Sequence, residues 1–302
     1  MSVRHEGRSR SRKTMAVLAR ICWVAFVVLL ITDLSLDLPG SSLWVLPAAV
    51  PAVALDLLNG RAARGEHTAL GRPPAIEVAP PVTGRWTALN SPADKVPSHG
   101  THGFGQTYAI DIVAEGQGEG EGDGAGKRPG FSWLWPLVRP SSAFPAHGRP
   151  LLAVADATVV HASDGQRDHL SRTSLPMVVY LMVLEGFFRS LGGPSRVTGN
   201  HLVLDLGGGT YALYAHVRRG SLAVRAGDRV RTGQRLAECG NSGNSSEPHV
   251  HFQLMDGPDL DTARGLPFSW HGIGVPSNGK TFTVPTAPPV TGPVTEPCDQ
   301  DV

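Results

Sequence analysis

The sequence is poor in cysteine and in charged residues. Its 302 residues include only three widely spaced cysteines, Cys22, Cys239 and Cys298, and 18% charged side chains with a net charge of +1 at pH 7. An odd set of cysteines without paired spacing argues against a disulfide framework and against a thiolate zinc site. A nearly neutral chain gives no electrostatic reason to expect nucleic acid as a partner. A metal site in this chain would therefore need histidine and carboxylate ligands.

Two familiar motifs are also missing. The triple glycine Gly207-Gly208-Gly209 is not followed by Lys-Ser or Lys-Thr, so it does not predict a phosphate-binding loop. No His-Glu-x-x-His sequence occurs, so the chain lacks the glutamate base that this metalloprotease motif supplies. Glycine (36) and proline (25) are instead abundant, which favours a turn-rich, mostly β protein.

The N-terminal region has the composition of a membrane anchor. Residues 1–13 carry five basic side chains, and 15–31 is apolar apart from Arg20, close to the lower length limit for a membrane helix. The basic flank predicts a cytoplasmic N-terminus. A signal peptide is the rival interpretation, but residues 32–37 offer no convincing small-x-small cleavage site.

A second apolar run, 42–58, leaves the topology open. It contains Pro47 and Pro51 and is followed by basic residues. If this run also spans the membrane as a hairpin, the rest of the chain returns to the cytoplasm; if it lies in the interface, the rest is outside. Hydropathy slightly favours the hairpin.

The remaining chain predicts one β domain with insertions. We expect a linker over 59–81, a domain over 82–272 and a Pro/Thr-rich tail over 273–302. Inside the domain, 115–130 is rich in Gly and Glu and predicts a loop. Within a helical insertion over 170–192, residues 175–188 have Glu185 as their only charge and predict a helix packed on the domain rather than one at the membrane interface. The aromatic run 131–135 is interpreted as core packing.

A His-x-His strand is the most informative stretch. By alternation, His249, His251 and Gln253 share one face of the strand 247–254, while three apolar residues, Val250, Phe252 and Leu254, share the other. Two imidazoles side by side suit a metal site in which one ligates the ion and the other acts on water. Two surface histidines are the alternative.

Two upstream strands supply residues of the same kind. The run 108–113 alternates as a strand and carries Asp111, a carboxylate that needs a partner if it is buried. His216 lies near the end of the strand-like run 211–217. A histidine and a carboxylate outside the His-x-His strand therefore raise the odds of a metal site.

Taken in order, these motifs resemble the LytM/lysostaphin-type zinc endopeptidases. The similarity is carried by Tyr214-Ala215-His216, Gly227-Asp228-Arg229-Val230, Thr232-Gly233-Gln234 and Pro248-His249-Val250-His251-Phe252. The resemblance implies a mostly β fold: a small antiparallel two-sheet β-sandwich or barrel-sandwich hybrid (the duplicated hybrid motif). To this the chain adds an N-terminal membrane helix or helical hairpin and an inserted helix.

The resemblance also implies roles for individual residues. By position, His251 and Asp111 are ligands of Zn²⁺, and His216 and His249 are the catalytic pair. The remaining ligand is a histidine before Asp111, and the common His-x3-Asp spacing is not kept. The candidates are His102 and His99, nine and twelve residues upstream; His102 is preferred because the shorter loop closes more easily.

The function implied is a membrane-anchored zinc metalloendopeptidase that hydrolyses peptide bonds in peptidoglycan. The N-terminal helix would hold it at the cell membrane, with the catalytic domain on the extracytoplasmic side. One alternative is a catalytically inactive module of the same fold that binds cell wall or activates another hydrolase. A second is a biotinyl- or lipoyl-type carrier, although the hairpin lacks the lysine that carries the cofactor.

Overall fold

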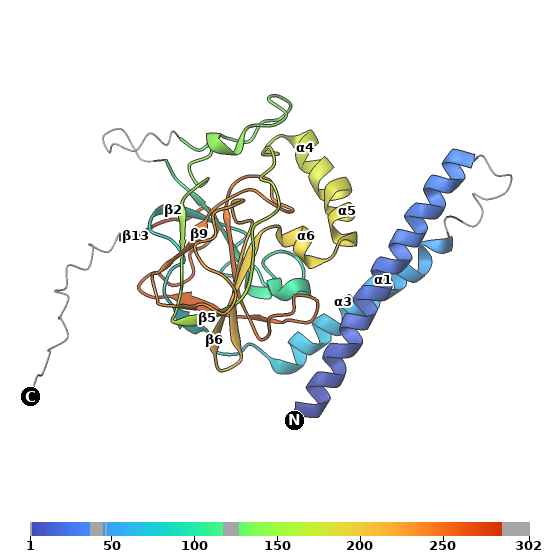
Figure 1. Ribbon diagram of the computed structural model, residues 1–302, viewed down its shortest axis with the longest axis horizontal. Coiled ribbons are helices and arrows are strands. Elements are labelled where there is room, and N and C mark those ends of the chain that lie inside the picture. Colours follow the sequence, from blue (N-terminus) through green and yellow to red (C-terminus); the bar gives the residue numbers. More distant parts are fainter. Residues whose placement is uncertain (1, 37–44, 46, 117–126, 286–302) are drawn as a thin grey trace, which may run out of the picture.

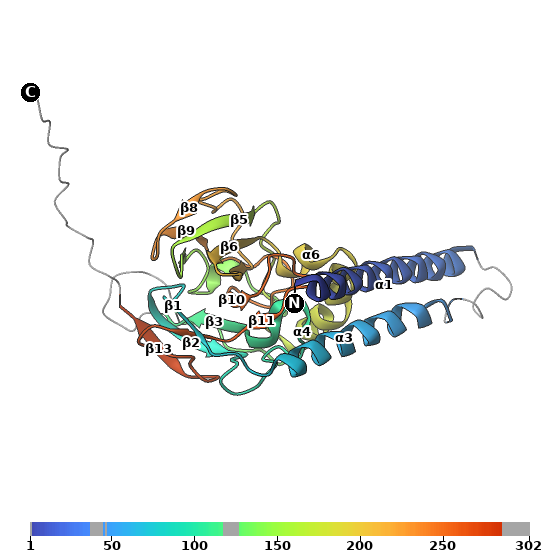
Figure 2. The same cartoon turned by 90° about the horizontal axis from the view of Figure 1, so that it is seen from below.

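The computed structural model describes residues 2–36, 45, 47–116 and 127–285. Two helices, α1 (Ser2–Leu36) and α3 (Val50–Leu70), lie side by side as a hairpin beside a β domain (Figures 1 and 2). Within the described ranges, one helical stretch, Arg10–Leu36, is long and apolar enough to cross a membrane. Helix α3 has a proline in its first turn and continues to Leu70. Residues 59–70 of the predicted linker 59–81 are therefore part of this helix.

The basic end of α1 is held by carboxylates. The ion pairs join Arg12 to Glu66 of α3, Lys13 to Asp259, and Arg20 to Asp261. The guanidinium of Arg12 also donates to the backbone oxygen of Thr262. Both helices of the hairpin therefore meet the domain at the same end.

A nine-stranded antiparallel sheet forms the main layer, in the order β13-β2-β3-β10-β7-β6-β5-β8, with β11 paired to β10. Its strands are β2 (Gly84–Leu89), β3 (Ile110–Ala114), β5 (Ala157–Ser163), β6 (His201–Gly207), β7 (Thr210–Ala215), β8 (Arg229–Val230), β10 (Val250–Met255), β11 (Gly265–Leu266) and β13 (Thr281–Val284). A two-stranded sheet, β4 (Pro150–Leu152) with β9 (Arg235–Glu238), is separate from it. The mostly β, antiparallel fold predicted from the sequence is confirmed.

The core lies between these layers and follows from strand alternation. Val250, Phe252 and Leu254 of β10 are buried in one cluster with Leu151 of β4 and Leu236 of β9. The Tyr214 hydroxyl joins the layers by donating to the Leu152 oxygen at 3.0 Å. With the apolar face of β10 committed to the core, its polar face is directed to the opposite side of the sheet.

The β6–β7 hairpin forms where it was predicted. Gly207 pairs with Thr210, which leaves Gly208 and Gly209 as the two turn residues, with φ of 61° and 77°. A tight two-residue hairpin of this kind needs positive φ at both positions, which glycine adopts without strain.

Two strands lie beyond the predicted domain boundaries. β1 (Ile76–Val78) pairs in parallel with β12 (Phe268–Trp270), and β13 pairs with β2. The domain therefore starts before residue 82 and continues past 272. The predicted tail over 273–302 includes β13, and its last part, 286–302, lies outside the described residues.

The predicted helical insertion is present. α4 (Leu175–Tyr180), a π-helical turn, η3 (Leu181–Glu185), and α5 (Gly186–Leu191) follow one another without leaving helical geometry, and we call them together the 175–191 helix. A short helix, α6 (Pro194–Thr198), follows, and two 3-10 turns, η1 (Gly103–Tyr108) and η2 (Ser141–Ala143), complete the elements. The predicted loop 115–130 lies mostly outside the described residues.

The aromatic run 131–135 does not pack in the core. Trp133 and Trp135 are 75% and 80% exposed, and Phe131 and Leu134 are also exposed. The prediction of core packing for this run was therefore wrong.

Candidate metal centre

Three neighbouring strands bring the predicted site residues together. His251 on β10 lies opposite Asp111 on β3 and opposite Ala215 on β7. Directly opposed residues of antiparallel strands hold their Cβ atoms about 5 Å apart, so the side chains of Asp111 and His251 meet. His216 follows β7 with a φ of 59°, a strained conformation for a residue other than glycine, of the kind that clusters at functional sites.

His99, and not His102, completes a cluster with these residues. The His99 Nε2 lies 2.9 Å from Asp111 Oδ2, and His251 Nδ1 lies 2.8 Å from Asp111 Oδ1. The donor atoms of His99, Asp111 and His251 all lie within 4.8 Å of one another. Histidine and carboxylate donors at this spacing can hold a divalent cation.

The protonation of His251 can be derived from its partners. The Gln253 amide nitrogen donates to the Phe104 oxygen at 2.7 Å, so the Gln253 Oε1 faces His251 Nε2, at 3.0 Å. An amide oxygen only accepts, and His251 Nε2 must therefore carry a proton. In the neutral ring, Nδ1 then presents a lone pair to Asp111, which is itself an acceptor.

The same reasoning applies to His99. The Ser98 hydroxyl donates to the Ala109 oxygen at 2.6 Å, so its oxygen accepts from His99 Nδ1, at 3.0 Å. The neutral ring then presents the lone pair of Nε2 to Asp111. Two imidazole lone pairs and a carboxylate facing one another require a positive species between them, and this donor set fits Zn²⁺.

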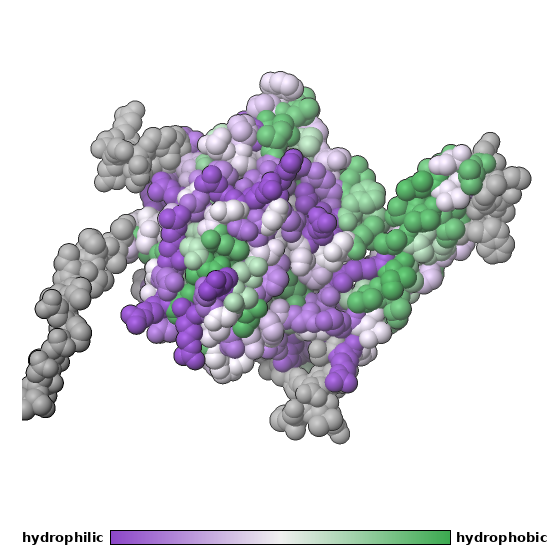
Figure 3. Space-filling view, in the orientation of Figure 1, coloured by the Kyte–Doolittle hydropathy of each residue, from purple (hydrophilic) through white to green (hydrophobic). Residues whose placement is uncertain are grey.

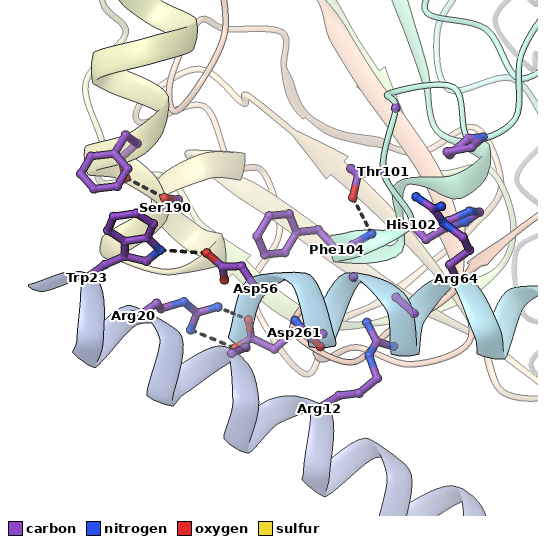
Figure 4. A pocket seen from close by; sticks show the side chains of 18 of the residues that line it. Arg12, Arg20, Trp23, Asp56, Arg64, Thr101, His102, Phe104, Ser190 and Asp261 are labelled. Carbon is purple, nitrogen blue, oxygen red and sulfur yellow. Dashed lines mark hydrogen bonds and ion pairs between the residues drawn. The ribbon is translucent and has the colours of Figure 1, made fainter. Parts of the chain in front are cut away.

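The preferred candidate, His102, is directed elsewhere. Its ring packs against His67 of α3, with centroids 4.6 Å apart, and its Nδ1 lies 3.1 Å from the Thr107 hydroxyl. His102 lines a cavity of about 540 Å³ between the hairpin and residues 95–104 (Figure 4). The chain turns at Phe104 and Gly105, both with positive φ, before it enters β3. The structure does not support the preference for His102.

His216 and His249 lie beside the cluster as a pair, with ring centroids 4.8 Å apart. His216 Nδ1 lies 2.8 Å from the Ser242 oxygen, and His249 Nδ1 lies 2.8 Å from the Glu247 oxygen. Since a carbonyl oxygen only accepts, each Nδ1 is the donor, and each Nε2 remains for the site. The structure thus brings together five of the six predicted residues.

Burial and neighbouring charges shift the pKa values of Asp111 and His249 in opposite directions. Burial, aided by His249 and His251, places the pKa of His216 well below its usual value, so its ring is neutral at neutral pH. Burial opposes the charge of Asp111, but His99 and His249 outweigh it and hold the pKa of Asp111 well below its usual range. For His249, burial is outweighed by Asp111, and its pKa is raised.

Three supporting residues were not identified from the sequence. The Asn90 amide donates to Asp111 Oδ2 at 2.8 Å, Ser98 supports His99, and Gln253 supports His251. Gln253 shares a strand face with His251, so period-two alternation could have indicated its role. Asn90 and Ser98 come from loops whose course no local pattern predicts.

The site thus combines an antiparallel β fold with a His/Asp/His cluster that could hold a metal ion and with two further imidazoles beside it. Residues 183–262 match the model described as Peptidase family M23. The resemblance to LytM/lysostaphin-type peptidases predicted from the sequence is thus confirmed over these residues.

Several solved structures are similar. The catalytic domain of the antimicrobial peptidase lysostaphin from Staphylococcus simulans is 21% identical, with 46% of this chain and 86% of that chain covered and a TM-score of 0.26. Lysostaphin itself is 20% identical (54% and 45% covered, TM-score 0.29), and Helicobacter pylori Csd3 is 13% identical (70% and 36% covered, TM-score 0.32). The chain thus spans less than half the length of lysostaphin and of Csd3.

Proposed function

We propose that the chain is a membrane-associated, zinc-dependent endopeptidase that hydrolyses peptide bonds of peptidoglycan. The observation that carries this proposal is the set of three converging donors, His99, Asp111 and His251, beside the imidazoles of His216 and His249. The Nε2 atoms of both imidazoles are directed to the site, and that of His249 lies 3.5 Å from Asp111 Oδ1. A structural ion would need no such pair of imidazoles next to it.

His99 Nε2, Asp111 and His251 Nδ1 would hold the ion. When bound, Zn²⁺ lowers the pKa of water toward neutrality and polarises a carbonyl group. Asn90 and Gln253 would fix the ligands by hydrogen bonds to Asp111 and His251. Supporting contacts of this kind orient ligands and tune their basicity.

His216 and His249 would move protons and orient the reacting groups. With Nδ1 of each fixed by a backbone oxygen, Nε2 of each can accept a proton from water or donate one to the departing amine. His249, whose pKa is raised, can in its protonated form also donate a hydrogen bond from Nε2 to the oxyanion that develops on the scissile carbonyl. No glutamate base is needed in this arrangement.

Peptidoglycan is the proposed substrate because residues 183–262 match Peptidase family M23 and the motifs resemble the LytM/lysostaphin-type peptidases, a resemblance that implies this substrate. This substrate lies outside the membrane, and we place the catalytic domain on that side. The ion pairs of Lys13 and Arg20 with Asp259 and Asp261 favour an N-terminus on the same side as the domain. This proposal therefore departs from the cytoplasmic N-terminus that the basic flank predicts. The hairpin would then enter the membrane from the domain's side.

Variants of single histidines test the proposal. The zinc-loaded full chain should release new amino groups from purified peptidoglycan. His216→Ala should abolish this release while zinc stays bound, since His216 is not a proposed ligand. His271→Ala, at an exposed position after β12, is the matched control and should behave as the wild type. A zinc-loaded wild type that binds peptidoglycan without cleaving it would instead identify a binding module.

A further inference from the structure

The 175–191 helix has the reverse of the usual amphipathic arrangement. Seven of its large apolar side chains are between 43% and 61% exposed, namely Leu175, Val179, Tyr180, Met182, Val183, Leu184 and Phe188. Its acidic residue, Glu185, is turned inward and bonded to Arg172 at 2.6 Å. A helix on the surface of a water-soluble domain buries its apolar side and exposes its charges.

The inward side of this helix is fixed by specific contacts. Leu181 is fully buried, and Arg172, which holds Glu185, donates its backbone N–H to the Ser246 oxygen at 2.6 Å. Rotating the helix to hide its apolar side would break the Arg172–Glu185 pair, and the exposed apolar side is therefore part of the folded domain. Ser246 belongs to the turn before the His-x-His strand, so this helix is tied to the candidate metal centre.

The aromatic loop 131–137 extends the apolar surface. Leu175 N–H donates to the Ser132 oxygen at 3.1 Å, and the Ser174 hydroxyl donates to the Leu137 oxygen at 2.8 Å. These bonds fix the loop at the start of the 175–191 helix. Trp133 and Trp135 are largely exposed there, and tryptophan is enriched where proteins meet the headgroup region of a membrane.

The same surface is continuous with the candidate membrane helix. The ring of Phe187 on α5 meets the ring of Trp23 on α1, with centroids 5.2 Å apart. Hydrophobic side chains cover the 175–191 helix beside the hydrophobic outer part of the hairpin, and more lie at the top of the molecule where loop 131–137 runs (Figures 1 and 3). If α1 lies in lipid, the 175–191 helix lies at the boundary between that lipid and water.

A cationic groove borders the apolar side of the helix. A cavity of about 440 Å³ is lined by Tyr180, Leu184 and Phe188 together with Arg189 and Arg196. Glu185 also lines it and pairs with Arg189 at 3.8 Å, so the two arginines outnumber the one carboxylate. Apolar side chains next to guanidinium groups match the two parts of an anionic phospholipid at a membrane surface.

We propose that the 175–191 helix and the loop 131–137 form a second membrane-binding surface, through which the catalytic domain itself rests on a bilayer that contains anionic phospholipid. This contact is separate from anchoring by α1. It would fix the orientation of the domain and hold the candidate metal centre at a constant height above the membrane.

A site-specific probe in the full chain tests the proposal. In a chain with Cys22→Ser and Cys298→Ser, Val183→Cys carries an environment-sensitive fluorophore; Cys239 is fully buried and is not labelled. The matched control is Val160→Cys, an exposed valine on β5, a strand that lies apart from α4 and α5 (Figure 1). Both proteins are placed in phosphatidylcholine vesicles with and without phosphatidylglycerol, and nitroxide-labelled phosphatidylcholine is the quencher.

We expect a blue shift and quenching of the probe at position 183 and neither at position 160. Quenching at 183 should rise when phosphatidylglycerol is present, and Arg196→Ala should remove that rise. An unquenched probe at 183 would overturn the proposal. So would self-quenching at 183 that grows with protein concentration, because a second copy of the chain, and not lipid, would then cover this surface.

Discussion

His251 donates its Nε2 proton to Gln253 Oε1, two residues along the same strand, and thereby turns the lone pair of its Nδ1 toward Asp111. The amide of Gln253 is in turn fixed by the Phe104 oxygen. One hydrogen bond within β10 thus selects the tautomer that a metal ligand needs, because neutral histidine binds a metal through the nitrogen that lacks the proton.

Replacing Gln253 should therefore weaken metal binding without removing a ligand. In Gln253→Leu nothing accepts from His251 Nε2, so the other tautomer becomes accessible. We expect zinc affinity to fall by about 10- to 100-fold, as is typical when a supporting contact to a ligand is lost. Competition with a chromophoric chelator measures this. Gln234→Leu, at an exposed turn, is the control; equal affinity in both variants would contradict the role of Gln253.

The part of the site that the sequence predicts is the part that lies on strands. Period-two alternation places His249, His251 and Gln253 on one face of β10 and puts Asp111 opposite the apolar face of β3. This alternation depends only on the local geometry of a strand, and the packing of the rest of the chain does not change it.

Strand alternation could not decide between His99 and His102, because both lie in a loop. Closing a loop of twelve rather than nine residues costs only roughly 0.3 kcal/mol more, too little to decide the ligand. The decision comes from a distant contact: His102 packs on His67 of α3, while His99 reaches Asp111. The exposure of Trp133 and Trp135 is likewise a result of tertiary structure, which composition does not reveal.

A buried histidine away from the site should make the domain sensitive to acid. Burial lowers the pKa of His201 from its usual value of 6.5 to about 4. Between these values the unfolded chain binds a proton that the folded domain does not, so the free energy of unfolding falls as the pH drops from about 6.5 to about 4. The loss due to this residue is up to about 3 kcal/mol.

Urea unfolding of the fragment 72–302, which keeps the strands that the structure describes, β1 to β13, measures this effect. His201→Gln removes the titrating ring, and we expect the fall in stability between pH 7 and pH 5 to be smaller in the variant. The same fall in both proteins would contradict the assignment to His201.

The contact between α1 and the domain can be tested without introducing a new reactive group. Lys13 Nζ lies 2.6 Å from Asp259 Oδ2, so a carbodiimide should join the amine to the carboxylate directly. We expect mass spectrometry of treated membranes to find this linked peptide pair, and Lys13→Arg to abolish it. If the pair never forms in membranes, α1 and the domain are apart, and the arrangement with the N-terminus and the domain on one side is incorrect.

The zinc content of the full chain tests the central claim most directly. His99 and His102 lie in one loop, and His99→Ala and His102→Ala differ only in which imidazole is lost. We predict one zinc per chain in the wild type and in His102→Ala, and none in His99→Ala, because His99 Nε2 faces Asp111 and His102 packs on α3. Zinc retained in His99→Ala and lost in His102→Ala would contradict the metal centre described by the structure.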